Sequence, residues 1–123
     1  MIINKSNINN YIVGTTMNCS KRGVTSIEYI PDGITELYCN SNQLTSLPNL
    51  PSTLKELDCH NNKITSFPIL PNNLRTLFCG NNELGDNYPT DPFNEWVVKH
   101  NNRLRLHTRS ETIKELISKK IIK

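Results

Sequence analysis

Apolar and polar residues recur with a period of twenty along most of the 123-residue chain. Each block has one cysteine, a leucine or methionine two positions earlier and an aliphatic residue five positions later; the cysteines are Cys19, Cys39, Cys59 and Cys79. Leu57 and Cys59 alternate with polar residues, which predicts a short strand with both side chains on one face. A period near twenty predicts a solenoid, in which each turn buries its apolar face only by stacking on its neighbours.

Asparagine and proline also recur at fixed places between the predicted strands. The place three residues after the cysteine is asparagine in three blocks: Asn42, Asn62 and Asn82. At that place a side-chain amide can bond the backbone of adjacent turns, and Arg22 in the first block indicates that this ladder begins one turn later. Two pairs of prolines follow, Pro48/Pro51 and Pro68/Pro71. They exclude a helix and favour extended or polyproline II backbone on the outer side.

The repeated core reads L-x-x-L-x-C-x-x-N-x-L, as in Leu54, Leu57, Cys59, Asn62 and Ile64. This pattern resembles the leucine-rich repeat, with cysteine in place of the last aliphatic residue of the strand. The T-S-L-P and T-S-F-P sequences at 45–48 and 65–68 are similar to the short repeats of bacterial effectors, and similar arrays occur in proteins of giant DNA viruses. The resemblance covers about residues 14–89. It implies a mainly β member of the α/β solenoids, right-handed, with parallel strands and an irregular convex side.

We expect one domain over 1–123, with an N-terminal cap at 1–13, repeats at 14–89 and a helical C-terminal cap at 90–123. The N-terminal cap offers apolar residues to close the first turn: Ile2, Ile3, Ile8, Tyr11, Ile12 and Val13. Asp91 is the expected N-cap of a helix with Pro92 at its first position. Phe93, Trp96 and Val97 follow at helical spacing, with Trp96 as a lid over the last turn.

The remaining C-terminal residues predict two further elements. Residues 103–107 alternate basic and apolar side chains in the manner of a strand that pairs with the final turn. Thr108 and Glu111 resemble a capping box at the start of a second, short helix. Its apolar stripe comprises Ile113, Leu116, Ile117 and Ile121.

The cysteine column is interpreted as plain core. Stacked strands lie about 4.8 Å apart, so a straight column of thiols cannot surround one zinc ion with four ligands at about 2.3 Å. Parallel side chains do not converge as a disulfide requires, and a reactive thiol needs exposure beside a positive charge. A buried free cysteine packs as a small apolar group. We therefore expect no metal and no cofactor.

The residues that alternate with the buried column face solvent and supply the predicted binding site. The central outward column comprises Asn18, Tyr38, Asp58 and Phe78, with Thr16, Glu36, Glu56 and Thr76 on one flank and Ser20, Asn40, His60 and Gly80 on the other. Exposed aromatic residues with a polar surround are typical of interaction hot spots. We predict Tyr38 and Phe78 as anchors, Asp58, Glu36 and Glu56 as partners for basic side chains, and Asn40 and His60 as rim hydrogen-bonding groups. The alternative is a solvated face, or one covered by a chain end.

Charge is unevenly distributed along the chain. Residues 1–98 carry a net charge of −3 and residues 99–123 a net charge of +6. A basic segment can bind nucleic acid or a membrane surface, but this one lacks interleaved aromatic residues and is interpreted as a solvated cap. The chain lacks an apolar run of about 18 residues and a signal-like start, so we expect a cytoplasmic protein, in the host cytosol if it is encoded by a virus or pathogen.

Enzymatic motifs are missing from the sequence. It contains no G-x-x-x-x-G-K-[ST], H-E-x-x-H or G-x-S-x-G. The resemblance to effectors suggests a ubiquitin ligase, but the C-x-D motif of those ligases is absent. We expect a non-enzymatic module that binds another protein. The alternatives are a self-associating structural protein, that is, a homo-oligomer, and the recognition part of a ubiquitin ligase system without its catalytic domain.

Overall fold

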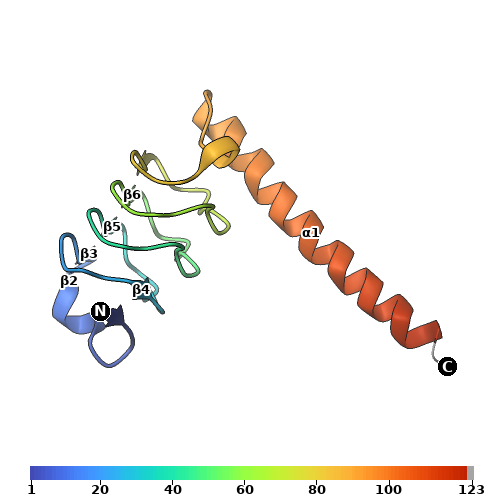
Figure 1. Cartoon of the computed structure of the whole chain (residues 1–123), viewed down its shortest axis with the longest axis horizontal. Helices are drawn as coiled ribbons and strands as arrows, with labels where there is room; N and C mark the ends of the chain where they lie inside the picture. The colour runs from blue at the N-terminus through green and yellow to red at the C-terminus, as the bar shows by residue number, and fades with distance from the viewer. Residues whose placement is uncertain (122–123) are drawn as a thin grey trace. The chain divides into compact units, whose positions relative to one another are not determined.

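Five short strands form the main sheet of the repeats. The structure is a computed structural model that describes residues 1–121, with side chains through Arg109 and at Ile113 and Lys114. The sheet order is β2-β3-β5-β6-β7, with bounds Ile12–Val13, Thr16–Asn18, Glu36–Tyr38, Glu56–Asp58 and Thr76–Phe78. From β3 to β7 the strands are parallel, and each residue pairs with the one twenty positions later. Figure 1 shows successive repeats stacked one on the next.

The N-terminal residues cover the first repeat on two sides. β2 adds to the sheet antiparallel to β3, while β1 (Ile2–Ile3) pairs in parallel with β4 (Ser26–Ile27). A 3-10 helix, η1 (Ile8–Tyr11), lies between β1 and β2. Ile3 and Ile8 are buried, whereas Val13, just before the turn at Gly14, is 84% exposed. That the N-terminal residues close the first turn stays a prediction.

The predicted inward column forms the core. Leu37, Leu57 and the four cysteines are at most 5% exposed, and the thiols are free. Burial raises the pKa of Cys19 to about 11, and it raises the pKa values of the other three thiols above their usual range. The cysteines therefore pack as neutral apolar groups, as predicted from the alternation.

The asparagine ladder is confirmed and ties each repeat to the one before it. Asn62 Nδ2 donates to the carbonyl oxygens of Cys39 at 3.0 Å and Cys59 at 3.1 Å. Its Oδ1 accepts the backbone N–H of Leu44 at 3.0 Å. Asn42 and Asn82 repeat this arrangement, and Asn42 accepts the N–H of Arg22, so the ladder begins one turn after the first cysteine.

A column of left-handed residues turns the chain out of each strand. It comprises Lys21, Ser41, Asn61 and Asn81, with φ values of 57°, 57°, 56° and 53°. This conformation costs an L-residue about 1–2 kcal/mol, least for asparagine. It keeps the backbone ladder running past the strand ends, since Ser41 N–H donates to the His60 carbonyl at 2.9 Å and Asn61 N–H to the Gly80 carbonyl at 2.9 Å.

The outer side of the repeats is irregular, as the prolines predicted. Residues 41–55 and 61–75, all of which the structure describes, contain no helix on this side. The chain turns back toward the next strand after Pro51 and Pro71, whose carbonyls accept the N–H groups of Leu54 and Leu74 at 3.1 Å. A short 3-10 helix, η2 (Gly85–Asn87), follows the last repeat.

The chain divides into two compact units, 1–88 and 89–123. The second unit contains α1 (Phe93–Ile121). The N–H groups of Glu95 and Trp96 both donate to the Pro92 carbonyl at 3.1 Å, and the helix begins at Phe93, one residue later than predicted. Trp96 stacks on His100 with ring centroids 4.9 Å apart. The role of Trp96 as a lid on the last repeat stays a prediction.

Two predictions for the C-terminal residues are wrong. Residues 103–107 are helical and not a strand, because good helix formers continue to Ile121 without a glycine or proline. Thr108 lies inside α1 and donates its hydroxyl to the Leu104 carbonyl at 3.0 Å, so it caps no second helix with Glu111.

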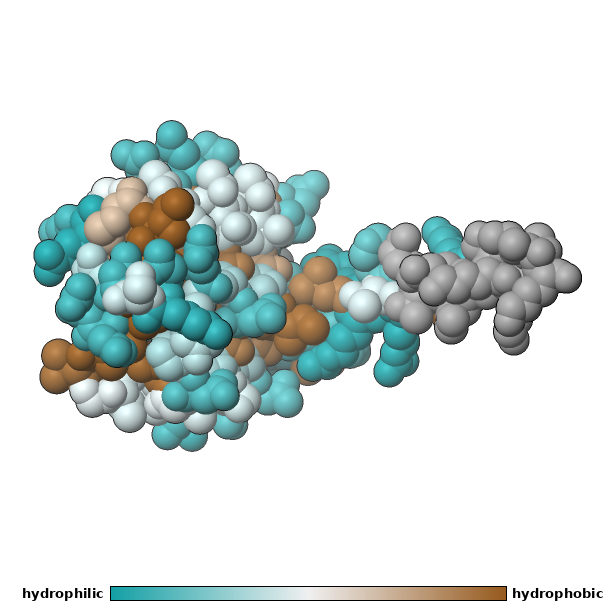
Figure 2. Space-filling view, turned by 90° about the horizontal axis from the view of Figure 1, so that it is seen from below, coloured by the Kyte–Doolittle hydropathy of each residue, from teal (hydrophilic) through white to brown (hydrophobic). Residues whose placement is uncertain are grey.

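The predicted apolar stripe therefore belongs to the one long helix. Ile113 is 55% exposed, and the side chains of Leu116, Ile117 and Ile121 lie outside the described residues. Val98 and Leu106 are also exposed, and Figure 2 shows apolar and polar residues side by side on the described part of this unit. Among the described residues, no helix is long and apolar enough to span a bilayer.

Candidate interaction face

The outward residues of the parallel strands form one surface, called here the sheet face. Its central column follows the strand register, Asn18 beside Tyr38, Tyr38 beside Asp58 and Asp58 beside Phe78. Its flanks are the residues two positions to either side along each strand: Thr16, Glu36, Glu56, Thr76, Ser20, Asn40, His60 and Gly80. Asn18 and Phe78 are exposed, whereas Tyr38 and Asp58 are half-buried.

Tyr38 joins the two glutamates of the first flank. Its hydroxyl lies 3.2 Å from Glu36 Oε2 and 3.1 Å from Glu56 Oε2, and Thr16 Oγ1 donates to Glu36 Oε2 at 3.3 Å. Desolvation, together with the hydrogen bonds and negative charge of the glutamates, raises the pKa of Tyr38 to about 12. The phenol therefore stays protonated at neutral pH and donates to the carboxylates.

The flanking glutamates also border a shallow hollow of mixed charge. Its volume is about 310 Å³, and its lining residues are Thr35, Glu36, Lys55, Glu56, Arg75 and Thr76. Among the described residues, no lysine or arginine nitrogen lies within 4.0 Å of a glutamate oxygen here. The carboxylates of Glu36 and Glu56 are therefore open to a cation from outside the chain.

Asp58 is held by side chains of the second flank. Its Oδ1 accepts the backbone N–H of His60 at 3.3 Å and pairs closely with His60 Nδ1. Its Oδ2 accepts a hydrogen bond from Asn40 Nδ2 at 3.3 Å, and Asn40 also donates to Ser20 Oγ at 2.8 Å. Both carboxylate oxygens of Asp58 are thus already engaged within the face.

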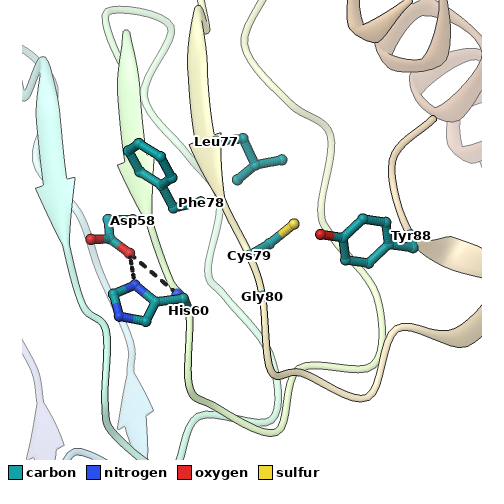
Figure 3. A pocket seen from close by; sticks show the side chains of 7 residues that line it. All are labelled: Asp58, His60, Leu77, Phe78, Cys79, Gly80 and Tyr88. Carbon is teal, nitrogen blue, oxygen red and sulfur yellow. Dashed lines mark hydrogen bonds and ion pairs between the residues drawn. The ribbon is translucent and has the colours of Figure 1, made fainter. Parts of the chain in front are cut away.

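An apolar hollow of about 510 Å³ opens beside the last strand (Figure 3). Its lining residues are Asp58, His60, Leu77, Phe78, Cys79, Gly80 and Tyr88. Phe78 is 53% exposed and Tyr88 is 52% exposed, so two aromatic rings present surface to solvent at this end of the sheet face. Gly80 contributes no side chain where the preceding repeats place His60, Asn40 and Ser20.

Tyr88 and Cys79 both line this hollow, and Figure 3 shows the Tyr88 hydroxyl and the Cys79 sulfur directed toward one another. Burial raises the pKa of the Cys79 thiol although the Tyr88 hydroxyl opposes the rise, and the nearby sulfur raises the pKa of Tyr88. A thiol held protonated in this way is a poor nucleophile.

The structure places all seven predicted binding residues on the sheet face, in three groups: Glu36, Tyr38 and Glu56; Asn40, Asp58 and His60; and Phe78 alone. Of the two aromatic residues predicted to be exposed, Phe78 is exposed, whereas Tyr38 is half-buried, with its hydroxyl between two carboxylates. Phe78 alone among the predicted anchors offers an open apolar surface.

Sequence reasoning missed Tyr88. It stands nine residues after Cys79, the position that proline occupies after Cys39 and Cys59. The replacement of this proline by a large aromatic residue, where the repeat pattern ends, is the sequence feature that could have identified Tyr88. In the structure, Tyr88 lies beside residues of the last strand.

The repeat geometry agrees with a comparison to known families. Residues 32–72 match the family model of leucine-rich repeats in two copies. Residues 32–72 are therefore leucine-rich repeats. The matched leucine-rich repeats include β5 and β6, and β3 and β7 keep the same twenty-residue register. No curated protein matches the chain. Leucine-rich repeats generally mediate contacts between proteins and are typically not catalytic.

Proposed function

We propose that this protein is a non-enzymatic module that binds another protein through its sheet face. The observation that carries the proposal is the exposed ring of Phe78 beside the apolar hollow, next to a hydrogen-bonded polar surface. An apolar anchor site with a polar surround is the usual anatomy of a protein interface. The repeats, in this proposal, form a right-handed solenoid closed at both ends, and the protein works in the cytosol.

The polar networks support recognition more than catalysis. Asp58 and His60 pair with each other, and Tyr38 pairs with Glu36 and Glu56, so these groups are held in defined positions. Groups held in advance lose little conformational entropy when a partner binds, which favours affinity and specificity.

Self-association is the second candidate. Val98, Leu106 and Ile113 on α1 are 58%, 61% and 55% exposed, an unusual amount of apolar surface for a solvated helix. A second copy could cover these side chains. A measured mass in solution separates this candidate from binding to a different protein.

Affinity capture from the cells that make the protein tests the proposal. The Tyr38→Ala, Phe78→Ala double variant should lose the captured protein, because it removes the aromatic residues of the sheet face. The matched control is Tyr29→Ala with Ile69→Ala, which removes comparably exposed apolar residues outside the five-stranded sheet. Equal capture by the wild type and the sheet-face variant would contradict the proposal, provided both variants remain folded and unfold cooperatively on heating.

A further inference from the structure

Gly80 lines the apolar hollow and adds no side chain to it. The three earlier repeats carry Ser20, Asn40 and His60 at this position, whereas the last repeat carries no side chain. A Cβ added at Gly80 would meet nothing within 4 Å, so the space beside it is open. Its backbone lies outside the left-handed region, so any side chain is sterically acceptable there. A side chain can therefore be added at position 80, beside the hollow, without backbone strain or a clash at its Cβ.

The walls of the hollow suit an apolar side chain. Phe78 and Tyr88 present ring surface, and Leu77 and Cys79 add apolar atoms between them. A volume of about 510 Å³ exceeds that of any single side chain, so an aromatic or branched aliphatic group fits with room for water.

The negative charges of Glu36 and Glu56 favour a basic residue elsewhere in the bound segment. Glu36 and Glu56 are register partners on neighbouring strands, and like charges in that position repel each other. The hydroxyl of Tyr38 has a single hydrogen, so it donates to one carboxylate at a time. Thr16 donates to Glu36, so each carboxylate can have one donor, but no lysine or arginine of the described residues pairs with either negative charge. A lysine or arginine from outside would supply the missing positive charge.

We propose that the hollow receives an apolar side chain from an extended basic segment of the partner, while a lysine or arginine of that segment binds Glu56 and Glu36. This inference rests on the proposed function and names the chemistry of the partner. Phe78 pairs with Asp58, so Glu56 lies one strand over and two residues along, a diagonal of about 7–8 Å. An extended chain advances about 3.4 Å per residue. The basic residue should therefore stand two to four residues from the apolar one.

Selection from a phage-displayed library of random dodecapeptides tests the proposal on the purified full chain. Selected peptides should share an aromatic or aliphatic residue with lysine or arginine two to four residues away. Gly80→Leu, which places a side chain in part of the hollow, should weaken their binding by about tenfold or more, a loss near 1.4 kcal/mol. Ser46→Leu adds the same side chain at an exposed outer position and should leave the affinity unchanged.

The charge contribution is tested with the same peptides. The Glu36→Gln, Glu56→Gln double variant should bind them several-fold less tightly and with less dependence on salt. Acidic consensus peptides, an empty selection, or binding indifferent to Gly80→Leu would each overturn the inference. If the peptides do not bind the Tyr38→Ala, Phe78→Ala double variant but still bind Gly80→Leu, this inference is contradicted and the proposed function is not. A dimer that Gly80→Leu dissociates would make a second copy the occupant and also overturn it.

Discussion

Glu36 and Glu56 lie directly opposite each other on neighbouring parallel strands, and their Oε2 atoms approach one hydroxyl, that of Tyr38. Two carboxylates in register would repel each other if no donor lay between them. The Tyr38 hydroxyl lies between the carboxylates and relieves part of that repulsion, and its hydrogen bonds hold the ring in place. Among the described residues, however, no lysine or arginine pairs with either carboxylate, so the two negative charges are not neutralised.

Tyr38→Phe should lower the free energy of unfolding by about 1 kcal/mol, because two carboxylates lose their shared donor. Urea denaturation at neutral pH measures the change. Adding Glu56→Gln to this variant should restore part of the loss, since it removes one of the two facing charges. Tyr29→Phe is the control outside the sheet and should have little effect. A Tyr38→Phe protein as stable as the wild type would show that the hydroxyl does not hold the carboxylates.

Asn62→Ala should be among the most destabilising single substitutions in the repeats. It removes bonds to the Cys39 and Cys59 carbonyls and to the Leu44 N–H, all in the interior. Leaving such groups unpaired costs about 1–3 kcal/mol each, so a loss of about 3 kcal/mol or more is expected by urea denaturation. Asn72→Ala, at an exposed position, should change stability by less than about 0.5 kcal/mol. Similar losses at the two positions would contradict the ladder's role.

Lys21→Gly should raise the free energy of unfolding by up to about 1 kcal/mol. Lys21 has φ of 57°, a left-handed conformation that glycine adopts without strain. Lys63→Gly is the matched control: Lys63 is equally exposed but has ordinary backbone, so glycine there should destabilise. Thermal unfolding of both variants should therefore give shifts of opposite sign. Shifts of the same sign would show that the left-handed backbone at Lys21 does not destabilise the fold.

Alkaline pH should destabilise the fold through its buried thiols. The pKa of Cys19 is raised from 9.0 to about 11, so the native state keeps a proton that the unfolded state releases. This contribution is complete below about pH 9 and is lost as pH rises to about 11, a change of about 2–3 kcal/mol. Cys19→Ala should flatten the pH dependence of unfolding in that window. An unchanged slope would mean that Cys19 stays protonated in both states or is exposed in the native one.

The repeats were predictable from sequence because one constraint acts twenty residues apart in every turn. Leu57 and Cys59 are buried and Asn62 bonds to the neighbouring repeat, and their equivalents have the same roles in the other repeats. Their spacing therefore predicts the strand register, the inward column and the asparagine ladder. The outward residues follow from the same alternation, since each strand residue next to a buried one must face the other way.

The parts that break the period were not predictable in the same way. Residues 103–107 alternate like a strand, yet the helix-forming context of α1 decides their conformation. Tyr88 lies after the last repeat, and its approach to Cys79 depends on how the chain leaves η2. The left-handed φ at Lys21 and Ser41 also carries no residue signature, because turn geometry imposes it on side chains that do not favour it.

Photo-crosslinking from the sheet face tests the central claim most directly. A benzoylphenylalanine placed at Phe78 should crosslink to a partner protein in an extract of the cells that make this chain. The same group at Ile69, which is 43% exposed outside the five-stranded sheet, should give no such product. A partner that crosslinks equally from position 69, or from position 69 alone, would contradict binding through the sheet face.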